Sequence, residues 1–165
     1  MIFLDTCVWI ELCCVTAPKS PSQVQRAQAA SNILAVAQQE HEEIITCAEQ
    51  LLEVISAIQK IKMRTYNQGC ANTSNSKVGN LKEYRSTADF KITQQLCEQT
   101  IEDIYMLASS QDIGTYDFDD ILQNLHLVDI NDCLYYRYCI NHQIKFYTFD
   151  HDFAKLETSS LIHII

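Results

Sequence analysis

The feature that most constrains the fold is the alternation of short apolar runs with longer segments of helical periodicity. The short runs are rich in β-branched residues, as buried parallel strands are. We expect strands at residues 2–4, 43–47, 144–148 and 161–165, and a weaker one at 113–116. Helices are expected at 6–15, 20–40, 48–62, 90–108, 118–124 and 130–141. This order predicts an α/β fold with a mainly parallel central sheet flanked by helices.

The whole chain, residues 1–165, is expected to form a single domain. Its length suits one hydrophobic core, and with only two prolines and three glycines it contains no obvious linker. A polar stretch at about 67–80 is expected to be a surface loop or insertion. No apolar run approaches the ~20 residues of a membrane span. The first ten residues lack the basic flank of a signal peptide, so we expect a cytoplasmic protein.

Cysteine is unusually frequent, with eight residues in the chain. No pair has the C-x-x-C spacing of zinc ribbons or thioredoxin-like sites. Most lie in apolar segments, where a free cysteine behaves as a small hydrophobic residue. We therefore expect reduced, structural thiols, with Cys70 in its polar surroundings as the most reactive one.

Two aspartates stand at the ends of predicted strands. Asp5 follows the strand at 2–4, and Asp150 follows the run at 145–149. In a parallel sheet the carboxyl ends of the strands share one edge, where ligands bind. Both carboxylates are therefore expected in one crevice.

Two further acids can reach the same edge. Asp132 begins a helix-like run, and Glu53 lies on the helix after the second strand. Carboxylates that converge repel one another unless one is protonated or a cation lies between them. An all-oxygen site favours Mg²⁺ or Mn²⁺, which can polarise a phosphate and lower the pKa of bound water.

Each of these acids also has a simpler structural role. Asp5 and Asp132 have the position of helix caps, and Asp150 that of a turn residue. Glu49 is a rival to Glu53 on the same helix. Spacing alone leaves these alternatives open.

Four blocks of the sequence carry a more specific signal. They are MIFLDTCVWI at 1–10, TCAEQLLE at 46–53, NDCLYY at 131–136 and FYTFDHDF at 146–153. In this order they resemble the blocks of PIN-domain ribonucleases, especially the VapC-like toxins of bacterial toxin–antitoxin pairs. Bulky Tyr135 and Tyr136, and the long polar segment at 63–92, depart from the family pattern.

The resemblance implies a three-layer PIN-like domain that cleaves RNA endonucleolytically with Mg²⁺ or Mn²⁺. It also implies a homodimer and often a cognate antitoxin. The carboxylates carried over as catalytic metal ligands are Asp5, Glu53, Asp132 and Asp150. The peripheral residues are Asp152 as a minor metal ligand, and Thr6 and Thr148 as hydrogen-bonding supports.

Positive charge is concentrated in one segment of a chain whose net charge is −9. Seven of the twelve Lys and Arg residues lie between positions 60 and 91, opposed there only by Glu83 and Asp89. Such a segment suits an RNA phosphate backbone or is a solvated helical face. The residues we expect to bind RNA are Lys60, Lys62 and Arg64.

Other functions remain compatible with the sequence. A PIN-like module could bind RNA or protein without turnover. A haloacid-dehalogenase-type phosphoryl-transfer enzyme would need Asp-x-Asp after the first strand, where this chain has Cys7. A receiver domain would need an early acidic pair, which is also missing.

Overall fold

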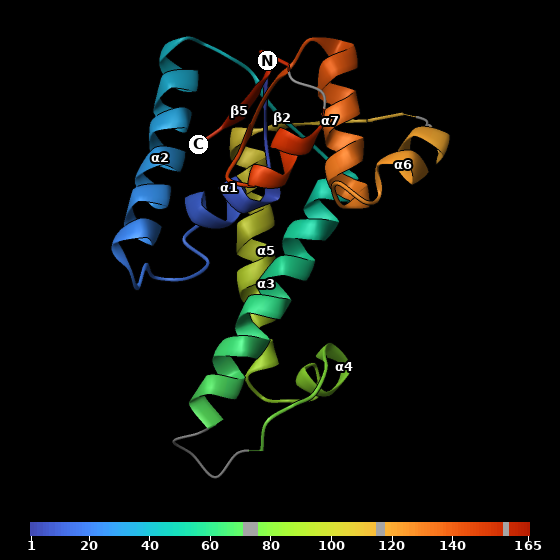
Figure 1. Cartoon of the computed structure of the whole chain (residues 1–165). Helices are drawn as coiled ribbons and strands as arrows, with labels where there is room; N and C mark the ends of the chain where they lie inside the picture. Colours follow the sequence, from blue (N-terminus) through green and yellow to red (C-terminus); the bar gives the residue numbers. More distant parts are fainter. Residues whose placement is uncertain (71–75, 115–117, 157–158) are drawn as a thin grey trace.

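A parallel sheet of five strands forms the centre of the computed structural model, which describes residues 1–70, 76–114, 118–156 and 159–165 (Figure 1). The strand order is β3-β2-β1-β4-β5, and every neighbouring pair is parallel. The strands are β1 Ile2–Leu4, β2 Ile44–Cys47, β3 Ser109–Gln111, β4 Lys145–Thr148 and β5 Ile162–Ile164. The predicted α/β fold with a parallel sheet is confirmed.

The central strand β1 pairs in register with both of its neighbours, β2 and β4. Phe3 lies opposite Ile45 of β2 on one side and Phe146 of β4 on the other. The residue after β1, Asp5, continues this pairing by donating its backbone N–H to the carbonyl of Tyr147. The carboxyl ends of β1, β2 and β4 therefore meet at one edge of the sheet.

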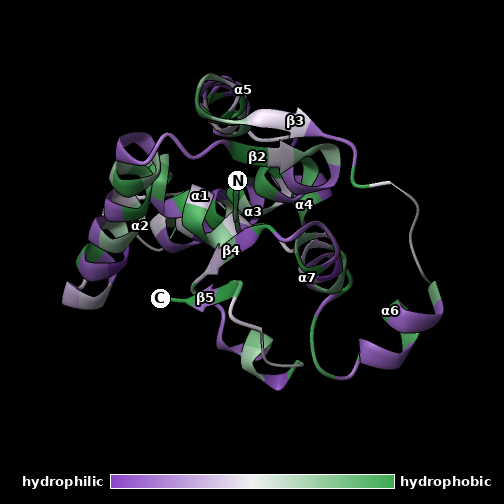
Figure 2. Cartoon of the chain, turned by 90° about the horizontal axis from the view of Figure 1, so that it is seen from above, coloured by the Kyte–Doolittle hydropathy of each residue, from purple (hydrophilic) through white to green (hydrophobic). Residues whose placement is uncertain are grey.

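Helices cover both faces of the sheet and give it three layers (Figure 2). Side chains alternate along β1, so that Ile2 and Leu4 face one layer and Phe3 faces the other. On the first face lie α1 Thr6–Leu12, α2 Pro21–Gln39, α3 Ala48–Gly69 and α5 Phe90–Leu107. On the second lie α6 Phe118–Asn124, α7 Ile130–His142 and the short 3₁₀ helix η2 His151–Lys155.

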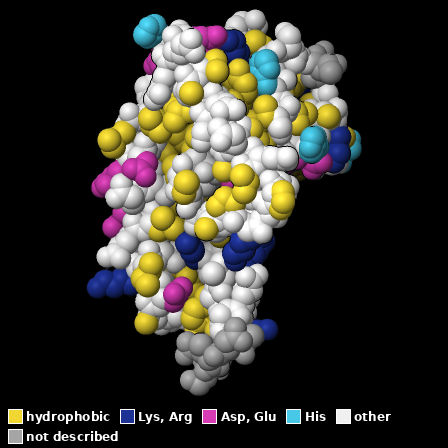
Figure 3. Space-filling model, turned by 90° about the vertical axis from the view of Figure 1, so that its left-hand side faces the viewer, with side chains coloured by type: hydrophobic (Ala, Val, Ile, Leu, Met, Phe, Trp, Pro, Cys, Tyr) yellow, Lys and Arg dark blue, Asp and Glu magenta, His cyan; other side chains and the backbone are white. Residues whose placement is uncertain are grey.

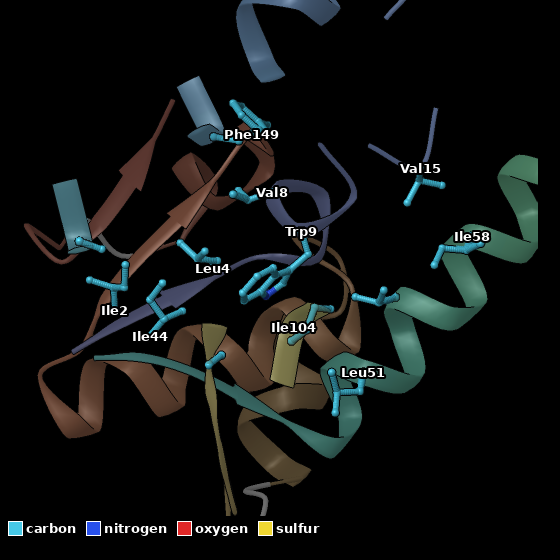
Figure 4. Packing of buried hydrophobic residues seen from close by; sticks show 14 of the residues in the cluster. Ile2, Leu4, Val8, Trp9, Val15, Ile44, Leu51, Ile58, Ile104 and Phe149 are labelled. Carbon is cyan, nitrogen blue, oxygen red and sulfur yellow. The ribbon is translucent and has the colours of Figure 1, made fainter. Parts of the chain in front are cut away.

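Trp9 lies at the centre of the core on the first face (Figure 4). Its side chain is fully buried among residues that include Leu4 and Ile104. An indole of this size contributes several kcal/mol of apolar burial, on the order of 3–5 kcal/mol against alanine. α1 is therefore fixed against the sheet, and with it the first turn that follows Asp5.

α3 extends well beyond the sheet, because its 22 residues make a helix of about 33 Å. α5 runs beside its outer half, and α4 Leu81–Tyr84 lies at the far end (Figure 1). The buried Tyr84 hydroxyl donates to Asp89 Oδ2 (2.7 Å) and contacts Thr93 Oγ1 (2.7 Å), so α4 is fastened to the start of α5. We call residues 59–69, 81–85 and 89–98 the arm.

Several predicted elements differ from the structure. The edge strand is β3 at Ser109–Gln111, so the strand expected at 113–116 is wrong for 113 and 114, and 115–116 lie outside the described residues. α3 continues past the expected end at 62 into the stretch expected to be a loop, of which 71–75 are not described. α4 and η2 were not expected.

The cysteines and the helices complete the comparison with the sequence. Cys70 is buried at the end of α3, with its Sγ 3.6 Å from the Ser76 carbonyl, so its expected place in a polar surface loop is wrong. All eight cysteines are free thiols. No helix in the described part of the chain combines the length and apolar character needed to cross a bilayer.

Candidate active site

Asp5 is the most buried acid of the sheet edge and is held by three donors. Its Oδ1 accepts from the Thr6 N–H (2.6 Å), so it caps α1 as predicted. Its Oδ2 accepts from Thr148 Oγ1 (2.5 Å) and Cys7 Sγ (3.1 Å). Burial raises the pKa of this carboxyl, the three donors lower it, and the charge of Asp150 raises it again. Asp5 is therefore rigid and sensitive to its acidic neighbours.

α3 delivers Glu53 to the same edge through a buried hydrogen-bond chain. Gln50, one turn before Glu53, is fully buried and donates from Nε2 to the Leu4 carbonyl (2.6 Å). Thr46 of β2 in turn donates to Gln50 Oε1 (2.8 Å). The first turn of α3 is thus locked to the end of β1, next to Asp5.

Glu53 also receives two donors from α7. Tyr135 donates its hydroxyl to Glu53 Oε2 (2.9 Å), and Asn131 Nδ2 donates to the same oxygen (3.1 Å). Burial raises the pKa of Glu53, the Tyr135 hydrogen bond lowers it, and the charge of Asp5 raises it. These contacts, and the effect of the Asp5 charge, favour Glu53 as the site residue.

Asp132 is the acid most perturbed by its neighbours. Burial raises the pKa of its carboxyl to about 7, with further contributions from the charges of Asp5, Glu53 and Asp150. Its carboxylate accepts no hydrogen bond from the described residues. It was expected to begin a helix, and that is wrong: Asp129 occupies the N-cap position of α7, and Asp132 lies in the first turn.

Asp150 follows β4 and caps η2 by accepting from the Asp152 N–H (2.8 Å). Its own backbone N–H donates to Thr148 Oγ1 (2.9 Å), which ties it to the hydroxyl that holds Asp5. Asp152 is exposed and forms an ion pair with Lys155 (2.6 Å). Asp132, Asp150, Asp152 and Lys155 line a surface hollow of about 260 Å³.

The structure thus brings Asp5, Glu53, Asp132 and Asp150 together, with Asp152 at the rim. The charge of Asp150 raises the pKa of Asp5, that of Asp5 raises the pKa of Glu53, and all three raise the pKa of Asp132. The Thr6 hydroxyl lies among them, buried and without a hydrogen-bond partner among the described residues. It is still near enough to lower the pKa of Glu53. An all-oxygen set with excess negative charge and an unpartnered hydroxyl fits a hard divalent cation.

The residue types at this site suit a divalent cation, but their side chains are not already arranged around one. Within the described residues, no three His, Cys, Asp or Glu side chains are arranged as a ready ligand set. The donors already on Asp5 and Glu53 leave lone pairs for a further ligand, since an ionised carboxylate has about four acceptor sites.

Sequence reasoning missed the residues that hold the acids in place. Gln50 and Asn131 gave no signal, because an amide in a helix is usually exposed. Tyr135 was noticed only as too bulky for its position, and that bulk is what lets its hydroxyl reach Glu53 across 82 residues of sequence. Cys7, in the expected block, contacts both Asp5 and the Phe149 N–H.

Comparison with known proteins adds the family. A model of the PIN domain matches residues 2–158, nearly the whole chain. No curated protein and no solved structure matches it. PIN domains are usually nucleases and typically use divalent metal ions. Because this match covers strands β1 to β4 and all four acids at their carboxyl ends, the chain belongs to the PIN domain family.

Proposed function

We propose that this protein is a metal-dependent endoribonuclease that hydrolyses RNA phosphodiester bonds at the carboxylate site. The observation that carries the proposal is the convergence of four acids at the carboxyl ends of the strands, close enough that Asp5, Glu53 and Asp150 all raise the pKa of Asp132. Proteins rarely bury such a set without function, because each uncompensated charge lowers stability. The family match supports a nuclease in general.

Mg²⁺ or Mn²⁺ would be held by Asp5, Glu53, Asp132 and Asp150, with Thr6 and Thr148 in support and Asp152 at the rim. When bound, such an ion stabilises charge on the phosphate and lowers the pKa of water. The chain itself supplies orientation. The donors on Asp5 and Glu53 fix those carboxylates, whereas the Asp132 carboxylate accepts no hydrogen bond from the described residues and is freer to adjust.

Cleavage of a labelled RNA by the purified protein tests the proposal. We expect products with Mg²⁺ or Mn²⁺, none with EDTA, and a loss of at least a hundredfold in Asp5→Asn. Glu102→Gln, an exposed change on α5, is the matched control and should leave cleavage intact. Equal cleavage in EDTA, or in Asp5→Asn, would exclude this mechanism.

The biological role is a further proposal, supported only by the four sequence blocks that resemble VapC-like toxins. It is that the protein acts in the cytoplasm as a homodimeric toxin restrained by a cognate antitoxin. Expression of the wild-type chain should arrest growth, and Asp5→Asn should relieve the arrest. Arrest by both proteins alike would refute a toxin that acts through this site.

One observation favours a second candidate, a PIN module that binds RNA or protein without turnover. It is the lack of a ready metal ligand set within the described residues. This alternative expects RNA or protein binding that Asp132→Asn does not change, and no metal-dependent product. The cleavage assay with EDTA separates the two candidates directly.

A further inference from the structure

α3 carries both a site carboxylate and much of the arm's positive charge. It is a continuous helix from Ala48 to Gly69, so positions on it follow helical geometry. At 3.6 residues per turn, Lys60 and Arg64 lie within about 20° of the direction of Glu53 around the helix axis. Lys62 lies at about 180°, on the opposite side. The concentration of positive charge in the sequence had predicted the same RNA-binding role for all three residues.

The surroundings of the three side chains agree with this geometry. Lys60 and Arg64 are exposed, whereas Lys62 is half-buried and lines a hollow that also includes Asp89 and Ile92. That hollow is on the side of α3 that faces α5. Ala57, one turn after Glu53 on the shared face, is too short to separate the carboxylate from the two cations.

The positive charges on the shared face are not neutralised within the described residues. Neither Lys60 nor Arg64 forms an ion pair there. The two acids of the segment accept from other groups: Glu83 from the Gly79 N–H (2.6 Å), and Asp89 from the Tyr84 hydroxyl (2.7 Å).

Arg85 adds a third cation at the same level of the helix. It donates from Nε (3.0 Å) and Nη2 (2.8 Å) to Gln59 Oε1, a neutral acceptor beside Lys60, so its charge is retained. On the face drawn in Figure 3, several Lys and Arg side chains likewise lie in the lower half of the molecule, at the level of the arm.

On the basis of the nuclease activity proposed above, we infer that Lys60 and Arg64 bind the phosphate backbone of the substrate RNA on one side of the cleaved bond, and that Lys62 does not. The rise of 1.5 Å per residue places them about 10 Å and about 17 Å along the axis from Glu53. With about 3.4 Å per stacked nucleotide, these are phosphates about three and five nucleotides from the cleavage point.

The test compares two matched variants of the full chain, Lys60→Gln/Arg64→Gln and Lys62→Gln. Binding of a fluorescein-labelled single-stranded RNA is measured by anisotropy in EDTA at 50 to 200 mM salt. Each lost phosphate contact reduces the slope of log K against log salt by about 0.7. We expect a reduction of about 1.4 in the double variant and none in Lys62→Gln. Circular dichroism checks that both variants fold.

The outcomes separate this inference from the proposed activity. If the wild type cleaves RNA but the double variant keeps the full salt slope, the inference is wrong and the nuclease stands. If the slopes change as expected but no metal-dependent product forms, RNA binding by Lys60 and Arg64 is supported and the proposed nuclease activity is refuted. An equal reduction in Lys62→Gln, or no RNA binding by the wild type, would overturn the inference.

Discussion

Replacing Asp132 by Asn should stabilise the metal-free protein, and only at higher pH. Burial and four neighbouring acids raise the pKa of this carboxyl from 3.8 to about 7. Between these values the folded state binds more protons than the unfolded state, so the free energy of unfolding falls as the pH rises. Asn has no charge to lose and avoids that decrease.

The magnitude follows from the same shift. Three pKa units correspond to about 4 kcal/mol. Asp132 is only half-buried, so water screens part of the effect, and about 2 kcal/mol is a reasonable expectation. With a urea dependence of about 2 kcal/mol per molar, the unfolding midpoint of Asp132→Asn should exceed that of the wild type by about 1 M at pH 8. At pH 5 the carboxyl is still mostly protonated in the folded state but mostly ionised in the unfolded state, so only about a third of this difference, about 0.4 M, is expected. The midpoints should coincide only below about pH 4, where both states are protonated.

Urea unfolding in EDTA, followed by circular dichroism from pH 5 to pH 8, measures this difference. Glu102→Gln, which removes an exposed acid from α5, should follow the wild type at every pH. Added Mn²⁺ should raise the wild-type midpoint more than that of Asp132→Asn, because it compensates the repulsion. A midpoint difference that is the same at pH 5 and pH 8 would refute the reasoning.

Three substitutions probe the contacts around the site. Tyr135→Phe removes a donor that lowers the pKa of Glu53. We expect kcat/KM to fall by a factor that corresponds to about 1.5–3 kcal/mol, and the acidic limb of its pH profile to move to higher pH. Thr148→Val removes a donor to Asp5 and should cost about 1–3 kcal/mol in urea unfolding. Thr6→Val removes a hydroxyl that has no hydrogen-bond partner in the described structure. The free energy of unfolding in EDTA should stay the same, whereas the stabilisation by added Mn²⁺ should fall. An unchanged stabilisation by Mn²⁺ would argue against a role of Thr6 in metal binding.

The sheet edge could be predicted from sequence because strand ends are a local signal. An apolar run that stops at an acid identifies Asp5 and Asp150, and parallel topology then brings them together. β3 could not be found in this way. Its residues, Ser109–Gln111, are polar. As the outermost strand of the sheet it is held by backbone pairing to β2, so the sequence carries no hydrophobic pattern there.

The contacts that shape the site lie beyond such local signals. That Tyr135 reaches Glu53 depends on where α7 crosses the first turn of α3, and no spacing within either helix encodes that crossing. The opposite faces of α3 that carry Lys60 and Lys62, by contrast, follow from helical periodicity. They could have been predicted from the sequence if the helix had been known to continue to Gly69.

The anchoring of α3 at Gln50 has a mechanical consequence. The hydrogen bond at Gln50 fixes the inner end of α3 close to Glu53, and α4 and α5, which pack on its outer half, would move with the helix. A tilt of about 10° about Gln50 would displace Arg64, about 21 Å away, by about 4 Å, but Glu53, about 4.5 Å away, by less than about 1 Å. On the RNA-binding role proposed above, such a tilt would let the outer end of the arm adapt to RNA backbones of different shape while the carboxylate beside Gln50 stays in place.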